Sequence, residues 1–237
     1  MELSLVARRV LAELVGTAFL VMAVIGSGIA AARLSPGDVG LELLENSLVT
    51  GAALIALITA LQPVSAAFNP VVTLVERALG GITSGHAVAL IGGQLVGGVL
   101  GAIAANLMFD LDAVSIAAHH RASGAHLFAE VIATAGLLIV IFGAARSGRT
   151  DRIAVTVGAY ITAAYWFTSS TSFANPAIAV GRMFSDTFVG IAPASVAGFV
   201  GMQLVGGVVG YLLIRALFPH VSGTPVAPVV AAEGQPT

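Results

Sequence analysis

The stretch Ser65-Ala66-Ala67-Phe68-Asn69-Pro70-Val71 has a counterpart in the second half of the chain, Phe173-Ala174-Asn175-Pro176-Ala177. Each stretch places an asparagine directly before a proline. The residue before a proline avoids the helical region, whereas proline suits the first position of a helix and asparagine suits the capping position before it. Each Asn-Pro pair therefore predicts that a helix begins at the proline.

Long apolar windows surround both stretches and predict six membrane crossings of about 20 residues each. The windows are Val10 to Ala32 (interrupted only by Glu13), Asn46 to Val75, Ala78 to Phe109, Val131 to Ala145, Ile153 to Gly181, and Thr187 to Ile214. The fourth reaches this length only if Glu130 lies within the membrane. The two windows that hold the Asn-Pro pairs are too long for one helix. Each predicts a full helix, a loop and a short half-helix, and the alternative is a kinked long helix or an interfacial segment.

The composition supports a membrane protein. Only 9% of the 237 residues are charged and 57% are apolar, against about 25% charged residues in soluble domains. The net charge is -2 and all ten basic residues are arginine, so no nucleic-acid partner is expected. The chain has no cysteine, which excludes disulfides, thiolate metal sites and cysteine nucleophiles. We expect no cofactor, no metal and no catalytic residue.

The two halves of the chain repeat each other. Residues 12–18, which begin Ala-Glu, align with residues 129–135, and the sequence Gln-Leu-Val-Gly-Gly-Val occurs at both 94–99 and 203–208. The offsets for the Ala-Glu, Asn-Pro and Gln motifs are 117, 106 and 109 residues. Three matches in one order at nearly one offset indicate an internal duplication. Because each half crosses the membrane three times, the second half enters from the opposite side, as an inverted repeat.

Inverted symmetry brings the two half-helices into the membrane from opposite faces, with their N-termini meeting near the centre. Each N-terminus carries roughly half a positive charge, so the pair repels cations, and the amides of Asn69 and Asn175 can donate hydrogen bonds to a neutral solute. The alternative is two ordinary capped helix starts in buried loops.

On these motifs, over roughly residues 10 to 217, the chain resembles the major intrinsic protein family, the aquaporins and aquaglyceroporins. The resemblance implies an all-α membrane protein with six transmembrane helices and two re-entrant half-helices, assembled as a homotetramer in the lipid bilayer. It also implies a pore midplane formed by Asn69, Pro70, Val71, Asn175, Pro176 and Ala177. Val71 departs from the family's alanine.

The domain organisation follows from the repeat and the charges. We expect a cytoplasmic N-terminus at residues 1–9 and a single channel domain at 10–217, with repeats at about 10–109 and 126–217. A disordered cytoplasmic tail is expected at 218–237. With both termini cytoplasmic, seven arginines lie inside and three outside, in agreement with the positive-inside rule. The inner set is Arg8, Arg9, Arg77, Arg146, Arg149, Arg152 and Arg215, and the outer set is Arg33, Arg121 and Arg182.

Glu13 and Glu130 are acidic residues in or near the membrane, where a charge is costly unless it is paired. In the family, the matching glutamates accept hydrogen bonds from the re-entrant loops, so the resemblance implies structural support. The alternative is a proton-coupling pair. Gln94 and Gln203 are expected to be buried polar side chains that bond nearby backbone.

The outer constriction departs from the family pattern. Most members have an arginine directly after the second Asn-Pro-Ala, and this chain has Ile178. Counting back from the second asparagine gives Ser172 and Ala163 as further filter residues, with Thr50 or Val49 from the second span. The register there depends on one residue deleted from the first loop. None of these residues is charged or a bulky aromatic. In this region the chain resembles an arginine-less bacterial branch of the family associated with arsenite movement.

Two other features of the outer side remain. Arg182 lies four residues after Ile178, so it either projects toward the vestibule or forms a salt bridge with Asp186. His119, His120 and His126 lie in the expected outer loop, where solvated histidines are expected rather than a metal site or a pH sensor.

The sequence therefore predicts a passive channel for small uncharged solutes in the inner membrane of a bacterium. The expected solutes are arsenous acid, glycerol-like polyols and water. The alternatives are a water-selective aquaporin and an ion-coupled transporter built on inverted repeats. An intramembrane enzyme would need a nucleophile or metal ligands, and the sequence shows no such motif.

Overall fold

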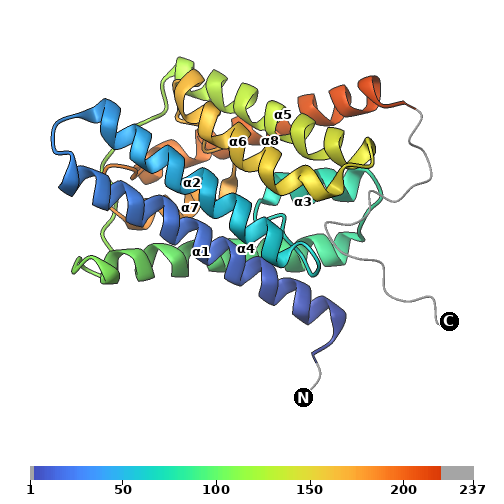
Figure 1. Ribbon diagram of the computed structural model, residues 1–237, viewed down its shortest axis with the longest axis horizontal. Helices are drawn as coiled ribbons and strands as arrows, with labels where there is room; N and C mark the ends of the chain where they lie inside the picture. Colours follow the sequence, from blue (N-terminus) through green and yellow to red (C-terminus); the bar gives the residue numbers. More distant parts are fainter. Residues whose placement is uncertain (1–2, 220–237) are drawn as a thin grey trace.

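The protein is a bundle of helices in the computed structural model, which describes residues 3–219 (Figure 1). The helices are α1 Leu5–Leu34, α2 Val39–Leu61, α3 Pro70–Ala78, α4 Ser84–Met108, α5 Gly124–Arg146, α6 Ile153–Phe167, α7 Pro176–Gly181 and α8 Pro193–Leu217, with 3₁₀ turns η1 Thr150–Arg152 and η2 Arg182–Phe184. The described residues contain no β-strand. All but the first two residues of the tail expected at 218–237 lie outside the described part of the chain.

Five helices, α1, α2, α4, α5 and α8, are long and apolar enough to cross a bilayer. The sixth, α6, has only 15 residues, or about 22 Å at about 1.5 Å per residue. It continues directly from η1 and packs against α2 and α5 within the same bundle. With its flanking segments it makes the sixth crossing, which confirms the expected all-α fold.

The half-helices α3 and α7 begin at Pro70 and Pro176, as the Asn-Pro pairs predict. In both cases the asparagine before the proline has an extended backbone, and its side-chain oxygen accepts a hydrogen bond from the helix's own backbone N–H at 2.9 Å. In Figure 1, α7 lies to the left and α3 to the right within the bundle.

Packing between the helices has the same pattern in both halves. Helix α1 packs on α4 and α2, as α5 packs on α8 and α6, and α2 meets α6 where the halves join. Each half-helix packs on helices of both halves, because α3 and α7 both contact α4 and α8. The half-helices therefore join the two repeats.

Glycines in the duplicated Gln-Leu-Val-Gly-Gly motif let helix backbones touch. A Cβ atom on Gly206 would lie 2.7 Å from the carbonyl oxygen of Val131, and one on Gly97 would collide with the carbonyl of Leu14. Only glycine permits such an approach between membrane helices. Leu14 and Val131 directly follow the two buried glutamates, so the duplicated Ala-Glu and Gln motifs are contact partners.

Candidate functional site

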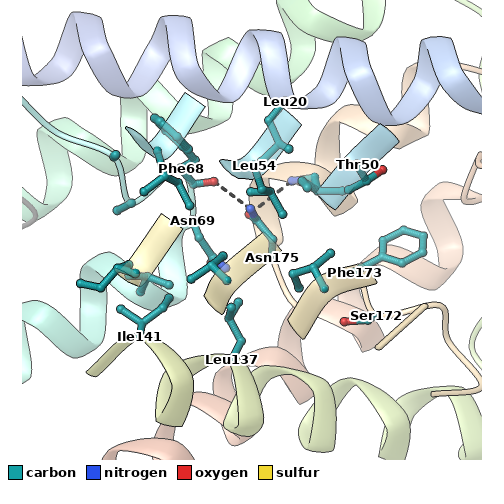
Figure 2. A pocket seen from close by; sticks show the side chains of 18 of the residues that line it. Leu20, Thr50, Leu54, Phe68, Asn69, Leu137, Ile141, Ser172, Phe173 and Asn175 are labelled. Carbon is teal, nitrogen blue, oxygen red and sulfur yellow. Dashed lines mark hydrogen bonds between the residues drawn. The ribbon is translucent and has the colours of Figure 1, made fainter. Parts of the chain in front are cut away.

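A narrow cavity of about 50 Å³ lies between the two halves, where the half-helices meet. Every fourth residue of three helices lines it, and this spacing places each series on one helix face. The series are Thr50, Leu54 and Ile58 of α2, Leu137 and Ile141 of α5, and Ile153, Val157, Ile161 and Tyr165 of α6 (Figure 2). The cavity wall formed by these helices is therefore mainly apolar.

The two asparagines form the polar wall of the cavity (Figure 2). The side-chain nitrogen of Asn69 donates to the carbonyl of Ala174 at 2.7 Å, and that of Asn175 donates to the carbonyl of Phe68 at 2.7 Å. An amide nitrogen has two hydrogens, so one N–H of each asparagine remains available to a solute. The expected midplane donors are thus brought together at one level of the cavity.

The carbonyls of Phe68 and Ala174 point toward the asparagines because both residues have a backbone conformation that L-residues rarely adopt. Phe68 and Ala174 both have φ of 48°, in the left-handed region. Such a conformation costs a non-glycine residue roughly 1–2 kcal/mol. The surrounding hydrogen bonds hold it in place, and the carbonyl then faces the asparagine of the other half.

Glu13 holds the first re-entrant loop with both carboxylate oxygens. Oε1 accepts from the Ser65 hydroxyl at 2.5 Å and the Ala67 N–H at 2.9 Å. Oε2 accepts from the Phe68 N–H at 2.7 Å and the Gln94 side-chain amide at 2.8 Å. The carboxylate is fully buried and does not line the cavity.

Glu130 holds the second loop in the same way. Oε1 accepts from the Ser170 hydroxyl at 2.6 Å and the Phe173 N–H at 3.0 Å. Oε2 accepts from the Ala174 N–H at 2.8 Å and the Gln203 amide at 2.6 Å. Four donors on each carboxylate favour the structural role over proton coupling.

Three of the five residues expected in the outer filter line the cavity: Thr50, Ser172 and Ile178. Thr50 is buried, whereas Val49 is 45% exposed and lies outside the cavity lining. The choice between Thr50 and Val49 that the sequence left open therefore falls on Thr50.

The expected contribution of Ala163 is wrong. This residue is exposed on the outside of α6, and Tyr165 lines the cavity in its place. Residues of one helix face recur every fourth position, so Ile161 and Tyr165 share the inner face, while Ala163 lies about 200° away from Ile161. The hydroxyl of Tyr165 on α6 lies 3.2 Å from the hydroxyl of Thr50 on α2.

Arg182, for which the sequence left open a vestibule position or a salt bridge with Asp186, also lines the cavity. Its Nε donates to the carbonyl of Val189, and its guanidinium lies 3.5 Å from the centre of the Phe173 ring. The carboxylate of Asp186 instead accepts from the N–H of Ala118 at 3.0 Å. The vestibule orientation of Arg182 is therefore the one adopted.

The three outer histidines do not converge on a site. His126 Nδ1 lies 2.6 Å from the carbonyl oxygen of Arg121, and the backbone carbonyl of His119 accepts from Ala192. His120 is exposed. Over residues 3–219, no group of three His, Cys, Asp or Glu side chains could hold a metal ion.

The family model of the major intrinsic proteins matches residues 2–169. The aquaglyceroporin AqpS of Rhizobium meliloti (strain 1021) is 44% identical over 211 residues, which cover 89% of this chain and 90% of that protein. Aquaporin Z of Photorhabdus laumondii is 28% identical over 235 residues, covering 89% of this chain and 97% of the relative. The X-ray structure of the aquaglyceroporin from Plasmodium falciparum has a similar fold, with a TM-score of 0.67, 20% identity, and coverage of 93% and 98%.

Proposed function

Because the chain belongs to the major intrinsic protein family, whose members are membrane channels and not enzymes, we propose that it conducts small, neutral, oxygen-rich solutes. The proposed solutes are arsenous acid, glycerol-like polyols and water.

The composition of the cavity wall carries this proposal. The residues that line it include no aspartate, glutamate, histidine or lysine, and its titratable side chains are Tyr165 and Arg182. Glu13 and Glu130 lie behind the wall with every oxygen bonded. A wall without a carboxylate or histidine offers no group to load and release a proton, which argues against coupled transport.

The pattern of polar and apolar groups supports the solute class. Apolar side chains of α2, α5 and α6 line the cavity together with two asparagine amides and the hydroxyls of Thr50 and Ser172. A neutral molecule with several hydroxyl groups can bond to such a line of polar groups while its carbon or arsenic centre contacts the apolar side. Ile178 adds a smaller apolar group at the position of the family's arginine, and a relative is named an aquaglyceroporin.

A water-selective channel is the second candidate. The narrow cavity and the presence of Tyr165 and Arg182 in its lining favour it, because both side chains reduce the width of the outer mouth.

The assembly and orientation belong to the same proposal. We infer a homotetramer in the inner membrane of a bacterium, with the N- and C-termini in the cytoplasm. Family membership, bacterial relatives and the distribution of the arginines support this. Native mass spectrometry in detergent would detect four chains of 23.8 kDa.

Stopped-flow light scattering on one batch of proteoliposomes tests the proposed function. We expect water, glycerol and arsenous acid all to cross faster than in protein-free vesicles, with rates unchanged by an imposed proton gradient. Passage of water alone would favour the water-selective candidate. A gradient-dependent rate would contradict a passive channel.

A further inference from the structure

The half-helix α7 and the 3₁₀ turn η2 that follows it place two cavity-lining side chains four residues apart. Ile178 lies at the position where most of the family has arginine, and Arg182 follows four residues later, in η2. Both line the central cavity, but Arg182 also lines a second cavity of about 180 Å³ on the outer side. Arg182 thus stands where the two cavities adjoin.

The guanidinium of Arg182 is fixed without an acidic partner. Arg182 is 2% exposed, its Nε donates to the carbonyl of Val189, and its Cζ lies 3.5 Å from the centre of the Phe173 ring. Phe173 is itself fixed, because its N–H donates to Glu130 at 3.0 Å and its ring packs edge-on against Phe199 at 5.0 Å between centroids. Within residues 3–219 the terminal nitrogens of Arg182 have no protein partner, and they are left to the cavities.

Among the residues that the structure describes, neither cavity supplies a counter-charge to Arg182; the carboxylate that acts on it electrostatically, Glu130, lies behind the wall and is bonded to four other donors. Arg121 lines the outer cavity and donates to the backbone carbonyls of Gly190 and Phe188 at 2.8 and 3.1 Å, so it adds a second positive charge. No carboxylate lines either cavity in the described part of the chain. A fixed positive charge in a narrow, poorly hydrated passage is a barrier to cations.

We propose that Arg182 is the specificity-determining cation of this channel. Its guanidinium narrows the outer mouth and repels cations one turn farther out than Ile178, while Ile178 changes the shape of the mouth without removing its charge. Arg121 strengthens the same field from the outer cavity. The inference rests on the proposed channel, whose water flux is measured separately in the unmodified protein.

Three variants in matched proteoliposomes test this role. Arg182→Leu removes the charge, and Arg182→Lys keeps it without the guanidinium group that contacts the Phe173 ring. Arg33→Leu is the control, because Arg33 also donates to a backbone carbonyl, that of Phe109 at 2.7 Å, and lies 5.3 Å from the Phe109 ring. Arg33 is exposed and lines neither cavity. Sodium conductance in planar bilayers and the ratio of glycerol to water flux are recorded for each.

We expect the unmodified channel, Arg182→Lys and Arg33→Leu to exclude sodium, and Arg182→Leu to conduct it. In Arg182→Leu the glycerol-to-water ratio should rise about tenfold, which corresponds to about 1.4 kcal/mol of lost barrier. A merely structural role would instead lower all fluxes together and keep the ratio. Sodium conduction by the unmodified protein or by Arg182→Lys, or exclusion of sodium by folded Arg182→Leu, would overturn the inference even when water flux establishes the channel.

Discussion

Glu13 and Glu130 act at the smallest scale, that of single hydrogen bonds. Each carboxylate has four donors directed at it, two of them backbone N–H groups of a re-entrant loop. An ionised carboxylate is acceptor-only, so it matches this set without a competing hydrogen. The residue type is required by the number of donors around it.

Replacing Glu130 by Gln should destabilise the protein. One acceptor oxygen becomes an NH₂ group that faces two donors, and each unsatisfied buried group costs about 1–3 kcal/mol. We expect a lower thermal unfolding temperature for Glu130→Gln and for Glu13→Gln. Asp151→Asn is the control, because the Asp151 side chain is 78% exposed and should leave stability unchanged.

Transport by the surviving Glu→Gln protein should not depend on a proton gradient. A variant of normal stability that has lost gradient-driven uptake would refute the structural role of these glutamates.

Comparing the two halves of the sequence could predict the repeated polar residues that bond to one another, but not every side chain that lines the outer end of the cavity. The glutamates, glutamines and asparagines repeat at nearly one offset, and the structure brings each set together. Tyr165 was missed because the count back from Asn175 assumed the family's loop length. The direction of Arg182 depends on Val189 and Phe173, which approach it only in the folded protein.

At the scale of helices, each half-helix is held against a glycine of the other half. A Cβ atom on Gly98 of α4 would lie 2.7 Å from the carbonyl oxygen of Ala177, and one on Gly207 of α8 would lie 2.8 Å from Cγ1 of Val71. The valine that departs from the family pattern therefore packs directly on α8.

Gly207→Ala should destabilise the protein by about 1–3 kcal/mol, because overpacking displaces Val71 and with it the start of α3. Val71→Ala removes the methyl group in the way, so the double variant should recover most of the loss in thermal unfolding and in glycerol flux. Gly201→Ala on the same helix is the control, since a Cβ there meets nothing within 4 Å.

A double variant that unfolds as early as Gly207→Ala would show that Val71 is not the obstructing contact. Destabilisation by Gly201→Ala would mean that alanine is unfavourable in α8 for another reason.

The starts of α3 and α7 could be predicted from Asn-Pro alone, because capping and the missing proline N–H act locally. The inner face of α6 could not be fixed from its own sequence. Its 15 residues are almost uniformly apolar, so the faces differ only in what packs against them.

At the scale of the whole molecule, none of the 237 residues is cysteine. A cysteine introduced at one position is therefore the only thiol that a reagent can modify. Thiol-directed mercurials should leave water flux through the unmodified protein unchanged. Thr50→Cys should make the flux mercurial-sensitive, because position 50 lines the cavity, whereas Val49→Cys should not, because position 49 faces outward. Stopped-flow water permeability before and after the reagent measures both.

Sensitivity of Val49→Cys together with insensitivity of Thr50→Cys would mean that α2 is rotated by one residue relative to the structure. Inhibition of the cysteine-free protein would place the reactive group elsewhere.

The hydrogen bonds exchanged between Asn69 and Ala174, and between Asn175 and Phe68, are reciprocal. Each half gives the other what it receives, as in the isologous contact of a two-fold dimer. A half-length ancestor inserted in both directions would have closed on a second copy of itself through these same two bonds. Seven residues after the asparagine, one half now carries Glu76, 4.0 Å from Arg9, and the other carries Arg182. The equivalent positions of the two halves therefore carry opposite charges, which two identical halves could not provide.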